Sequence, residues 1–134
     1  MKACQGCGAE LVRRHQQRFC SNACQREAER RRNIARWLET GETNGVSKTR
    51  GYVRLHLLDE QHGCCAICGS GSEWMGMPLV FVLDHVDGDA TNNRRENLRL
   101  VCPNCDSQLP TFKSRNRGKG RAWRRQRYLD GKSY

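Results

Sequence analysis

Long apolar runs are missing from this sequence of 134 residues, and apolar side chains as a whole are scarce. No run approaches the roughly 18 residues of a membrane-spanning helix. The opening stretch, MKACQGCG, contains no apolar segment of signal-peptide length. Hydrophobic residues make up 37% of the chain, so an ordinary apolar core would be thin. We therefore expect an intracellular protein without a membrane partner, stabilised by something besides apolar packing.

Cysteine supplies that stabilisation, because eight of the nine cysteines fall into two sets with metal-ligand spacing. Two cysteines separated by two residues can bind one tetrahedral ion, and a second cysteine pair completes its coordination. We therefore expect two structural Zn²⁺ ions. A redox pair would need a βαβ context that the sequence does not offer. Cys64 is left over and could replace Cys65, although the two-residue spacing favours Cys65. The sets are Cys4, Cys7, Cys20 and Cys24, and then Cys65, Cys68, Cys102 and Cys105.

The net charge of +10 is unevenly distributed along the chain. Residues 1–58 carry 12 basic and 5 acidic side chains, residues 59–106 carry 3 and 8, and residues 107–134 carry 9 and 1. Two basic arms predict a polyanionic partner, and an acidic centre suits an oxygen-ligated cation. The candidate contacts are Arg30, Arg31, Arg32, Lys113, Arg115, Arg117 and Lys119.

The first part of the chain predicts a zinc finger with a basic helix over residues 1–40. Ser21 is a typical cap for a helix that Gly41 would end, with an apolar face formed by Ala28, Ile34, Ala35 and Leu38. Residues 41–51 are polar and predict a linker. A turn, a hairpin and a helix carrying the last ligand resemble a treble-clef finger.

The second part predicts a separate domain over residues 52–117, followed by a basic tail over 118–134. Residues 52–62 predict a helix, PLVFVLDH a strand, VDGDATNNRRE a long loop, NLRLVC a returning strand and CPNCDSQL a short helix. Pro103 is suited to the first position of that last helix. The expected fold class is a small zinc-stabilised α+β protein.

This order brings four polar side chains toward one place. Asp84 ends the first strand and Asp106 begins the last helix, so both could bind one divalent cation such as Mg²⁺ or Mn²⁺. His85 is a natural base for activating water, and Asn97 can tie the loop to the opposite backbone. An EF-hand in the loop is disfavoured because Asn92 stands where that loop needs glycine.

DH, NNRRENLRLVC and PNCD together resemble the HNH endonuclease motif on its ββα-metal fold, over residues 63–117. The resemblance implies His85 as the base, Asn97 as the middle Asn, and Asp84 as the first metal ligand. Asp106 stands where the family's last His is expected. The N-terminal finger lies outside the resemblance.

The implied function is metal-dependent cleavage of DNA, as an endonuclease or nickase, leaving 5′-phosphate and 3′-hydroxyl ends, in a prokaryotic or phage-encoded protein. Two alternatives stay open. One is a zinc-dependent DNA-binding protein with weak or absent cleavage, which the change at Asp106 permits. The other is a zinc-ribbon interaction module, which leaves the four polar residues unexplained. A homodimer or a protein–nucleic-acid complex is compatible with the sequence, which leaves the choice open.

Overall fold

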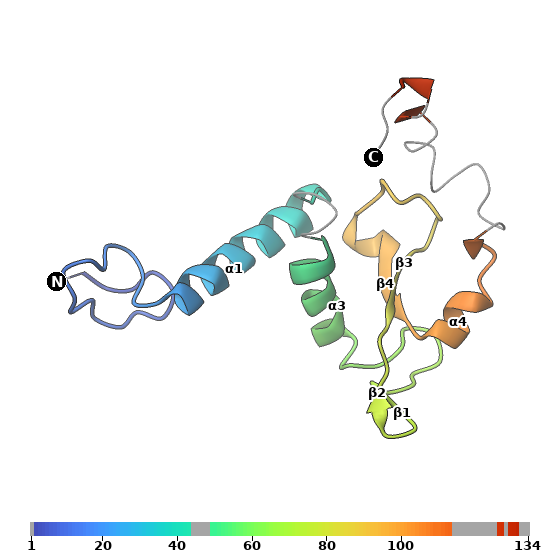
Figure 1. Ribbon diagram of the computed structural model, residues 1–134, viewed down its shortest axis with the longest axis horizontal. Coiled ribbons are helices and arrows are strands. Elements are labelled where there is room, and N and C mark those ends of the chain that lie inside the picture. The colour runs from blue at the N-terminus through green and yellow to red at the C-terminus, as the bar shows by residue number, and fades with distance from the viewer. Residues whose placement is uncertain (1, 44–48, 114–125, 128, 132–134) are drawn as a thin grey trace.

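A computed structural model describes residues 2–43, 49–113, 126, 127 and 129–131, without the side chains of residues 49 and 50. It is a small α+β protein in which one long helix leads from an N-terminal finger to a compact body (Figure 1). The elements are α1 (Asn22–Thr40), η1 (Thr49–Val53), α3 (Arg54–Glu60), β1 (Glu73–Trp74), β2 (Met77–Pro78), β3 (Val82–His85), η2 (Arg95–Asn97), β4 (Leu98–Val101) and α4 (Pro103–Ser107).

Helix α1 begins and ends where its capping residues predict. The Ser21 side chain accepts a hydrogen bond from the backbone N–H of Cys24 at 3.2 Å, which satisfies a donor that the helix itself cannot. Gly41 adopts the left-handed conformation at φ 73° and donates its N–H to the carbonyl of Trp37. Both ends of α1 are therefore set by local chemistry.

The apolar face expected for α1 is partly wrong. Ala35 and Leu38 are exposed, and Ile34 is only partly buried. Trp37 is the buried residue of this helix, with no exposed surface. The rest of the protein packs against α1 only at its last turns. Side chains of α1 are therefore buried only near that contact, and no apolar face is buried along the whole helix. Within the described residues, no helix is long and apolar enough to cross a membrane.

Strands β3 and β4 form an antiparallel hairpin, and α4 follows directly. Asp84 lies opposite Arg99, and His85 lies opposite Leu98. Cys102 caps α4 through its sulfur, which accepts from the N–H of Cys105. The strand, strand and helix form the ββα arrangement expected from the sequence.

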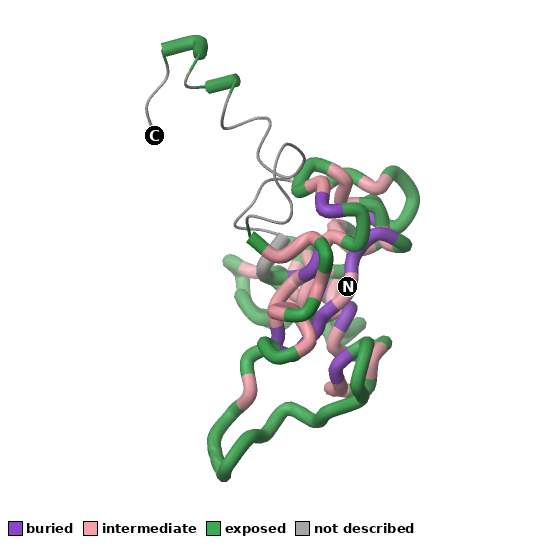
Figure 2. Tube along the Cα trace, turned by 90° about the vertical axis from the view of Figure 1, so that its right-hand side faces the viewer, coloured by how far each residue is buried: buried purple, intermediate pink, exposed green. Residues whose placement is uncertain are grey.

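The core lies between α1, η1, α3 and the β3–β4 hairpin. Its fully buried side chains come from all of these segments. They are Trp37, Val53, Leu57, Leu98, Leu100 and Val101. In Figure 2 the buried stretches of the chain lie mainly in the middle of the molecule. Trp37 therefore belongs to the same core cluster as buried residues between positions 52 and 102. The proposed division into a finger over 1–40 and a nuclease domain over 52–117 stays a prediction, and Trp37 contacts across it.

A second hairpin, β1–β2, was not expected from the sequence. It projects from the lower end of the body as an exposed loop (Figures 1 and 2). Its side chains Trp74, Met75 and Met77 are largely exposed. Each strand has only two residues, which is too short for a clear alternating pattern in the sequence.

Candidate active site and metal centres

Each predicted cysteine set gathers into one cluster. In both, the four sulfur atoms lie within 4.8 Å of one another. Sγ–Sγ distances of 3.7 Å for Cys7–Cys20 and 3.7 Å for Cys68–Cys102 match the ~3.8 Å edge of a tetrahedral site with Zn–S bonds of about 2.3 Å. The chemistry of the donors and their spacing thus fit zinc at both places. Cys64 lies outside both clusters, and its sulfur faces the carbonyl of His62.

Backbone N–H groups point at several of these sulfurs. Cys4 accepts from the N–H of Cys20 at 3.3 Å, and this bond is the largest cause that lowers the pKa of Cys4 to about 6. Cys65 accepts from the N–H of Cys102 at 3.2 Å. A hydrogen bond from Ser70 lowers the pKa of Cys68 to about 6. Donors of this kind favour the thiolate form that binds a metal.

Other sulfurs in the same clusters resist ionisation. The neighbouring thiol of Cys24 is the main cause that raises the pKa of Cys20 to about 12, and Cys102 acts in the same way on Cys105. Four thiolates within 4.8 Å repel one another unless a cation lies among them. Each cluster is therefore arranged for a divalent ion.

Asp84 at the end of β3 is a buried carboxylate, with 8% of its surface exposed. The Nε atom of Arg99 lies 2.8 Å from its Oδ2 atom, on the facing position of β4. The guanidinium supplies the positive charge that a buried carboxylate requires.

Asp106 on α4 is half-buried and close enough to Asp84 to feel its charge. Burial raises the pKa of Asp106, repulsion from Asp84 raises it further, and Lys113 opposes the rise. The charge of Asp84 disfavours ionisation of Asp106, and carboxylate oxygens are a fitting donor set for a cation such as Mg²⁺. Helix α4 packs against β3, so the two residues proposed as ligands lie on neighbouring elements.

His85 follows Asp84 and lies partly exposed at the end of β3. Its Nε2 atom lies 2.9 Å from the Oδ1 atom of Asn93 in the loop between the hairpin strands. An amide oxygen can only accept, so this contact requires Nε2 as the donor. The imidazole is therefore held by a side chain that the sequence analysis did not single out.

Asn97 is buried and holds the loop in the way expected for it. Its Oδ1 accepts from the N–H of Asp87 at 3.0 Å, and its Nδ2 donates to Asp87 Oδ1 and to the carbonyl of Asn92. A hydrogen bond from Asn92 is the main cause that lowers the pKa of Asp87. Asn97 therefore braces the loop through its bonds to Asp87 and Asn92, and its assignment as a catalytic residue stays a prediction.

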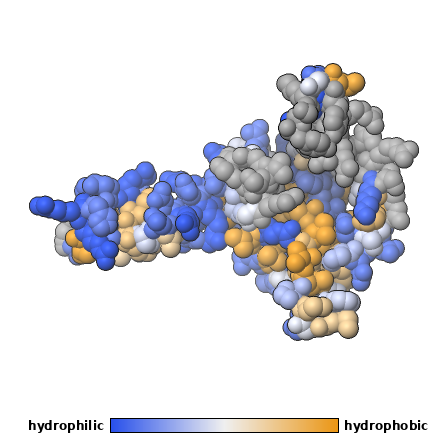
Figure 3. Space-filling model, in the orientation of Figure 1, coloured by the Kyte–Doolittle hydropathy of each residue, from blue (hydrophilic) through white to orange (hydrophobic). Residues whose placement is uncertain are grey.

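The proposed DNA contacts lie on two surfaces. Arg30 and Arg31 form ion pairs with Glu27 on α1, whose surface is mostly hydrophilic in Figure 3. Arg32 is exposed on the same helix. Lys113 is exposed beyond α4, with its Nζ atom 5.0 Å from the centroid of the Phe112 ring. Arg115, Arg117 and Lys119 lie outside the described residues.

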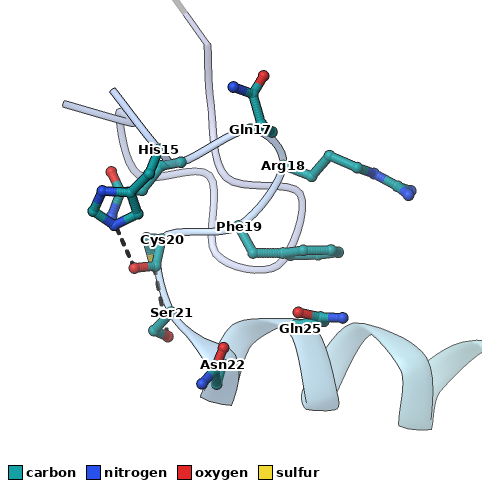
Figure 4. A pocket seen from close by; sticks show the side chains of 9 residues that line it. His15, Gln17, Arg18, Phe19, Cys20, Ser21, Asn22 and Gln25 are labelled. Atoms are coloured by element: carbon teal, nitrogen blue, oxygen red, sulfur yellow. Dashed lines mark hydrogen bonds between the residues drawn. The ribbon is translucent and has the colours of Figure 1, made fainter. Parts of the chain in front are cut away.

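A surface hollow of about 370 Å³ adjoins the first cysteine cluster (Figure 4). His15, Arg18 and Phe19 line it beside the start of α1, and Arg18 donates to Gln5. The 19 residues of α1 span roughly 28 Å, at about 1.5 Å per residue. The hollow is therefore remote from Asp84 and His85, and it takes no part in their site.

Two residues around the site escaped the sequence analysis, Asn93 and Arg99, as did Trp37 in the core. The position of Arg99 opposite Asp84 could have been predicted, because the register of a hairpin decides which residues face each other. Trp37 follows Ile34 at helical spacing, which also favours a shared face. No feature of the sequence indicated a role for Asn93, because an asparagine in a loop is an ordinary turn residue.

Comparison with known proteins shows similarity to HNH endonucleases. Residues 76–104 match the HNH endonuclease family. The H-N-H endonuclease F-TflIV of Escherichia phage T5 is 42% identical over 55 residues, which are 41% of this chain and 24% of that protein. The chain thus spans about a quarter of that relative's length. No solved structure matches.

Proposed function

We propose that this protein, whose residues 76–104 carry the HNH endonuclease motif, is a metal-dependent endonuclease or nickase that hydrolyses phosphodiester bonds in DNA. The observation that supports the proposal is the ββα unit itself, with Asp84 and His85 in the segment 76–104 that matches the family and Asp106 two residues beyond it on α4. A prokaryotic or phage origin and an intracellular location stay predictions, which the similarity to a phage protein supports.

Asp84 and Asp106 are the residues that would hold the catalytic cation. When bound, a Mg²⁺ or Mn²⁺ ion supplies Lewis-acid stabilisation of the charge that develops on the phosphate and on the leaving oxygen. The partial burial of both carboxylates strengthens their hold on a cation, because water screens them less.

His85 would act as the general base. Its free ring nitrogen accepts a proton from the attacking water, whose oxygen forms a bond to phosphorus. The bond from phosphorus to the 3′ oxygen breaks, and the 3′ oxygen gains a proton from solvent. The products are a 5′-phosphate and a 3′-hydroxyl.

Positive side chains would position the DNA backbone around this site. Lys113 follows α4 closely enough for its charge to act on Asp106, so it is suited to a phosphate next to the one that is cleaved. The arginines of α1 offer a second contact farther along the duplex. Both surfaces bind phosphates and carry no sequence information by themselves.

A DNA-binding protein with little cleavage is the second candidate. One observation favours it: Arg99 already neutralises Asp84, and this weakens the attraction of Asp84 for a cation. The carboxylate retains its second oxygen and its neighbour Asp106, so we prefer the nuclease.

Plasmid nicking by the purified protein tests the choice. The parent is incubated with supercoiled plasmid and Mg²⁺ or Mn²⁺, with His85→Ala and a chelator as controls. The nuclease proposal expects metal-dependent nicks that a ligase can reseal, because sealing requires the predicted ends. A gel shift without nicks at any metal concentration would support the second candidate.

A further inference from the structure

Trp37, in the last turn of the N-terminal helix α1, reaches the loop that carries Asn93. The side chain has no exposed surface, and its Nε1 atom donates to the carbonyl oxygen of Asn93 at 2.6 Å. The rings of Trp37 and His56 meet in a T-shaped arrangement with their centroids 5.5 Å apart. A buried indole N–H needs an acceptor, and here the acceptor is loop backbone 56 residues away.

A second contact joins the same two segments. Gly41, which ends α1, lies so close to Arg94 that an added Cβ would stand 2.7 Å from Arg94 Cγ and 3.5 Å from its Cα. The left-handed conformation of Gly41 also disfavours other residues. The end of α1 therefore contacts the loop at residues 93 and 94, through the Trp37 hydrogen bond and the close approach of Gly41 to Arg94.

The Asn93 side chain continues this path to His85. Its Oδ1 atom lies 2.9 Å from Nε2 of the imidazole. The remainder of the loop is braced separately by Asn97, which bonds Asp87 and Asn92. Within the described residues, Trp37 and Gly41 thus act on the part of the loop that touches His85.

We propose that Asn93 is a positioning residue for His85, and that Trp37 fixes Asn93, so that the finger helix forms part of the support of the catalytic site. The inference rests on the proposed function in taking His85 as the base. Held through Nε2, the ring keeps one tautomer and one orientation, with Nδ1 left to accept a proton. A base held in a productive orientation is worth a sizeable factor in rate, since a misplacement of 1 Å can cost on the order of 10²-fold.

Cleavage kinetics of single and double variants test the link. Asn93→Ala should lower kcat by roughly 10- to 100-fold with little change in KM, because substrate contacts remain. Asn93→Asp retains an acceptor and should recover most of kcat. Trp37→Phe should lower kcat in the same direction, whereas Leu57→Ala, which damages the same core without removing a hydrogen bond, should not.

The double variants separate positioning from a general loss of structure. If Asn93 and Trp37 act through His85, neither substitution should lower the residual rate of His85→Ala further. An equal fold loss in the parent and in the His85→Ala background would overturn the proposal. So would a full-rate Asn93→Ala protein.

Nitrogen-15 NMR of the imidazole provides a readout that needs no cleavage. The parent should show His85 as the Nε2–H tautomer, and this signature should be lost in Asn93→Ala and kept in Asn92→Ala, whose amide bonds Asp87 instead. A parent that shows the tautomer but never cuts DNA would contradict the proposed function and leave the Asn93–His85 contact supported. An unchanged tautomer in Asn93→Ala would overturn the contact, whatever the activity.

Discussion

Arg99 and Asp84 face each other across the β3–β4 hairpin, with Nε of Arg99 2.8 Å from Oδ2 of Asp84. Asp84 is buried, whereas the Arg99 side chain is 30% exposed. The pair therefore links the interior of the fold to the surface that would meet DNA. The carboxylate that pairs with this guanidinium is the one proposed to hold the catalytic cation.

Replacing Arg99 by Gln should leave a buried carboxylate without its charge partner. We expect a loss of about 1–3 kcal/mol in the free energy of unfolding, the usual cost of an uncompensated buried polar group. Chemical denaturation measures it. The double variant Asp84→Asn with Arg99→Gln should recover much of the loss, because no buried charge remains. A single variant as stable as the parent would show that the ion pair contributes nothing.

Removing one cysteine from the second cluster should unfold the ββα region. Cys102→Ser eliminates a zinc ligand but leaves a hydroxyl that can still cap α4, and structural zinc typically contributes on the order of 10–16 kcal/mol of binding energy to folding. Metal analysis should give two zinc ions for the parent. Cys64→Ser is the matched control and should retain both ions and the fold. Well-folded parent protein without zinc would contradict the assignment.

His85→Ala should fold, bind DNA and lose roughly 10²–10⁴-fold in cleavage rate, the usual share of general-base catalysis. His62→Ala, which replaces a histidine outside the site, should cut at the parent's rate. Single-turnover cleavage of a labelled duplex measures both. Normal cutting by His85→Ala would remove this residue from the mechanism.

Asp106 should show opposite effects on stability and on metal use. Its pKa is raised by burial and by Asp84, so its ionised form opposes folding. Asp106→Asn should therefore stabilise the zinc-loaded protein at neutral pH without Mg²⁺. This gain should vanish below the pKa of the unfolded carboxyl, near pH 4, because the parent residue is then neutral in both states.

Metal titration of cleavage completes the test of Asp106. Asp106→Ala should require much more Mg²⁺ than the parent, and Asp106→His should respond better to Ni²⁺ or Co²⁺, because imidazole suits those ions. If Asp106→Ala follows the parent's Mg²⁺ curve, the residue is not a ligand.

DNA affinity should depend steeply on salt through the arginines of α1. Arg32→Gln should reduce the slope of log affinity against log salt by about 1, the share of one phosphate contact. Glu27→Gln should increase affinity, because Glu27 competes with DNA for Arg30 and Arg31. Binding measured at several salt concentrations decides this. Slopes that match the parent in both variants would assign binding to the region after residue 113.

Local patterns in the sequence were sufficient for the cysteine clusters, the ends of α1 and the order of the ββα unit. These features depend on interactions within a few residues: the spacing of the ligands, the Ser21 cap and the Gly41 stop. They can therefore be predicted from the sequence without knowledge of the fold. The same holds for Asn97, whose bonds to Asp87 and Asn92 stay within one loop.

Contacts between distant segments depended on tertiary structure. Arg99 pairs with Asp84 only because the hairpin register places them opposite each other, and a shift of one residue would turn them to different faces. The charge of Asp84 raises the pKa of Asp106 only because α4 packs against β3. Trp37 meets Asn93 across 56 residues, since burying a large ring and satisfying its N–H depends on which surfaces come together, and nothing in the neighbouring sequence specifies that partner.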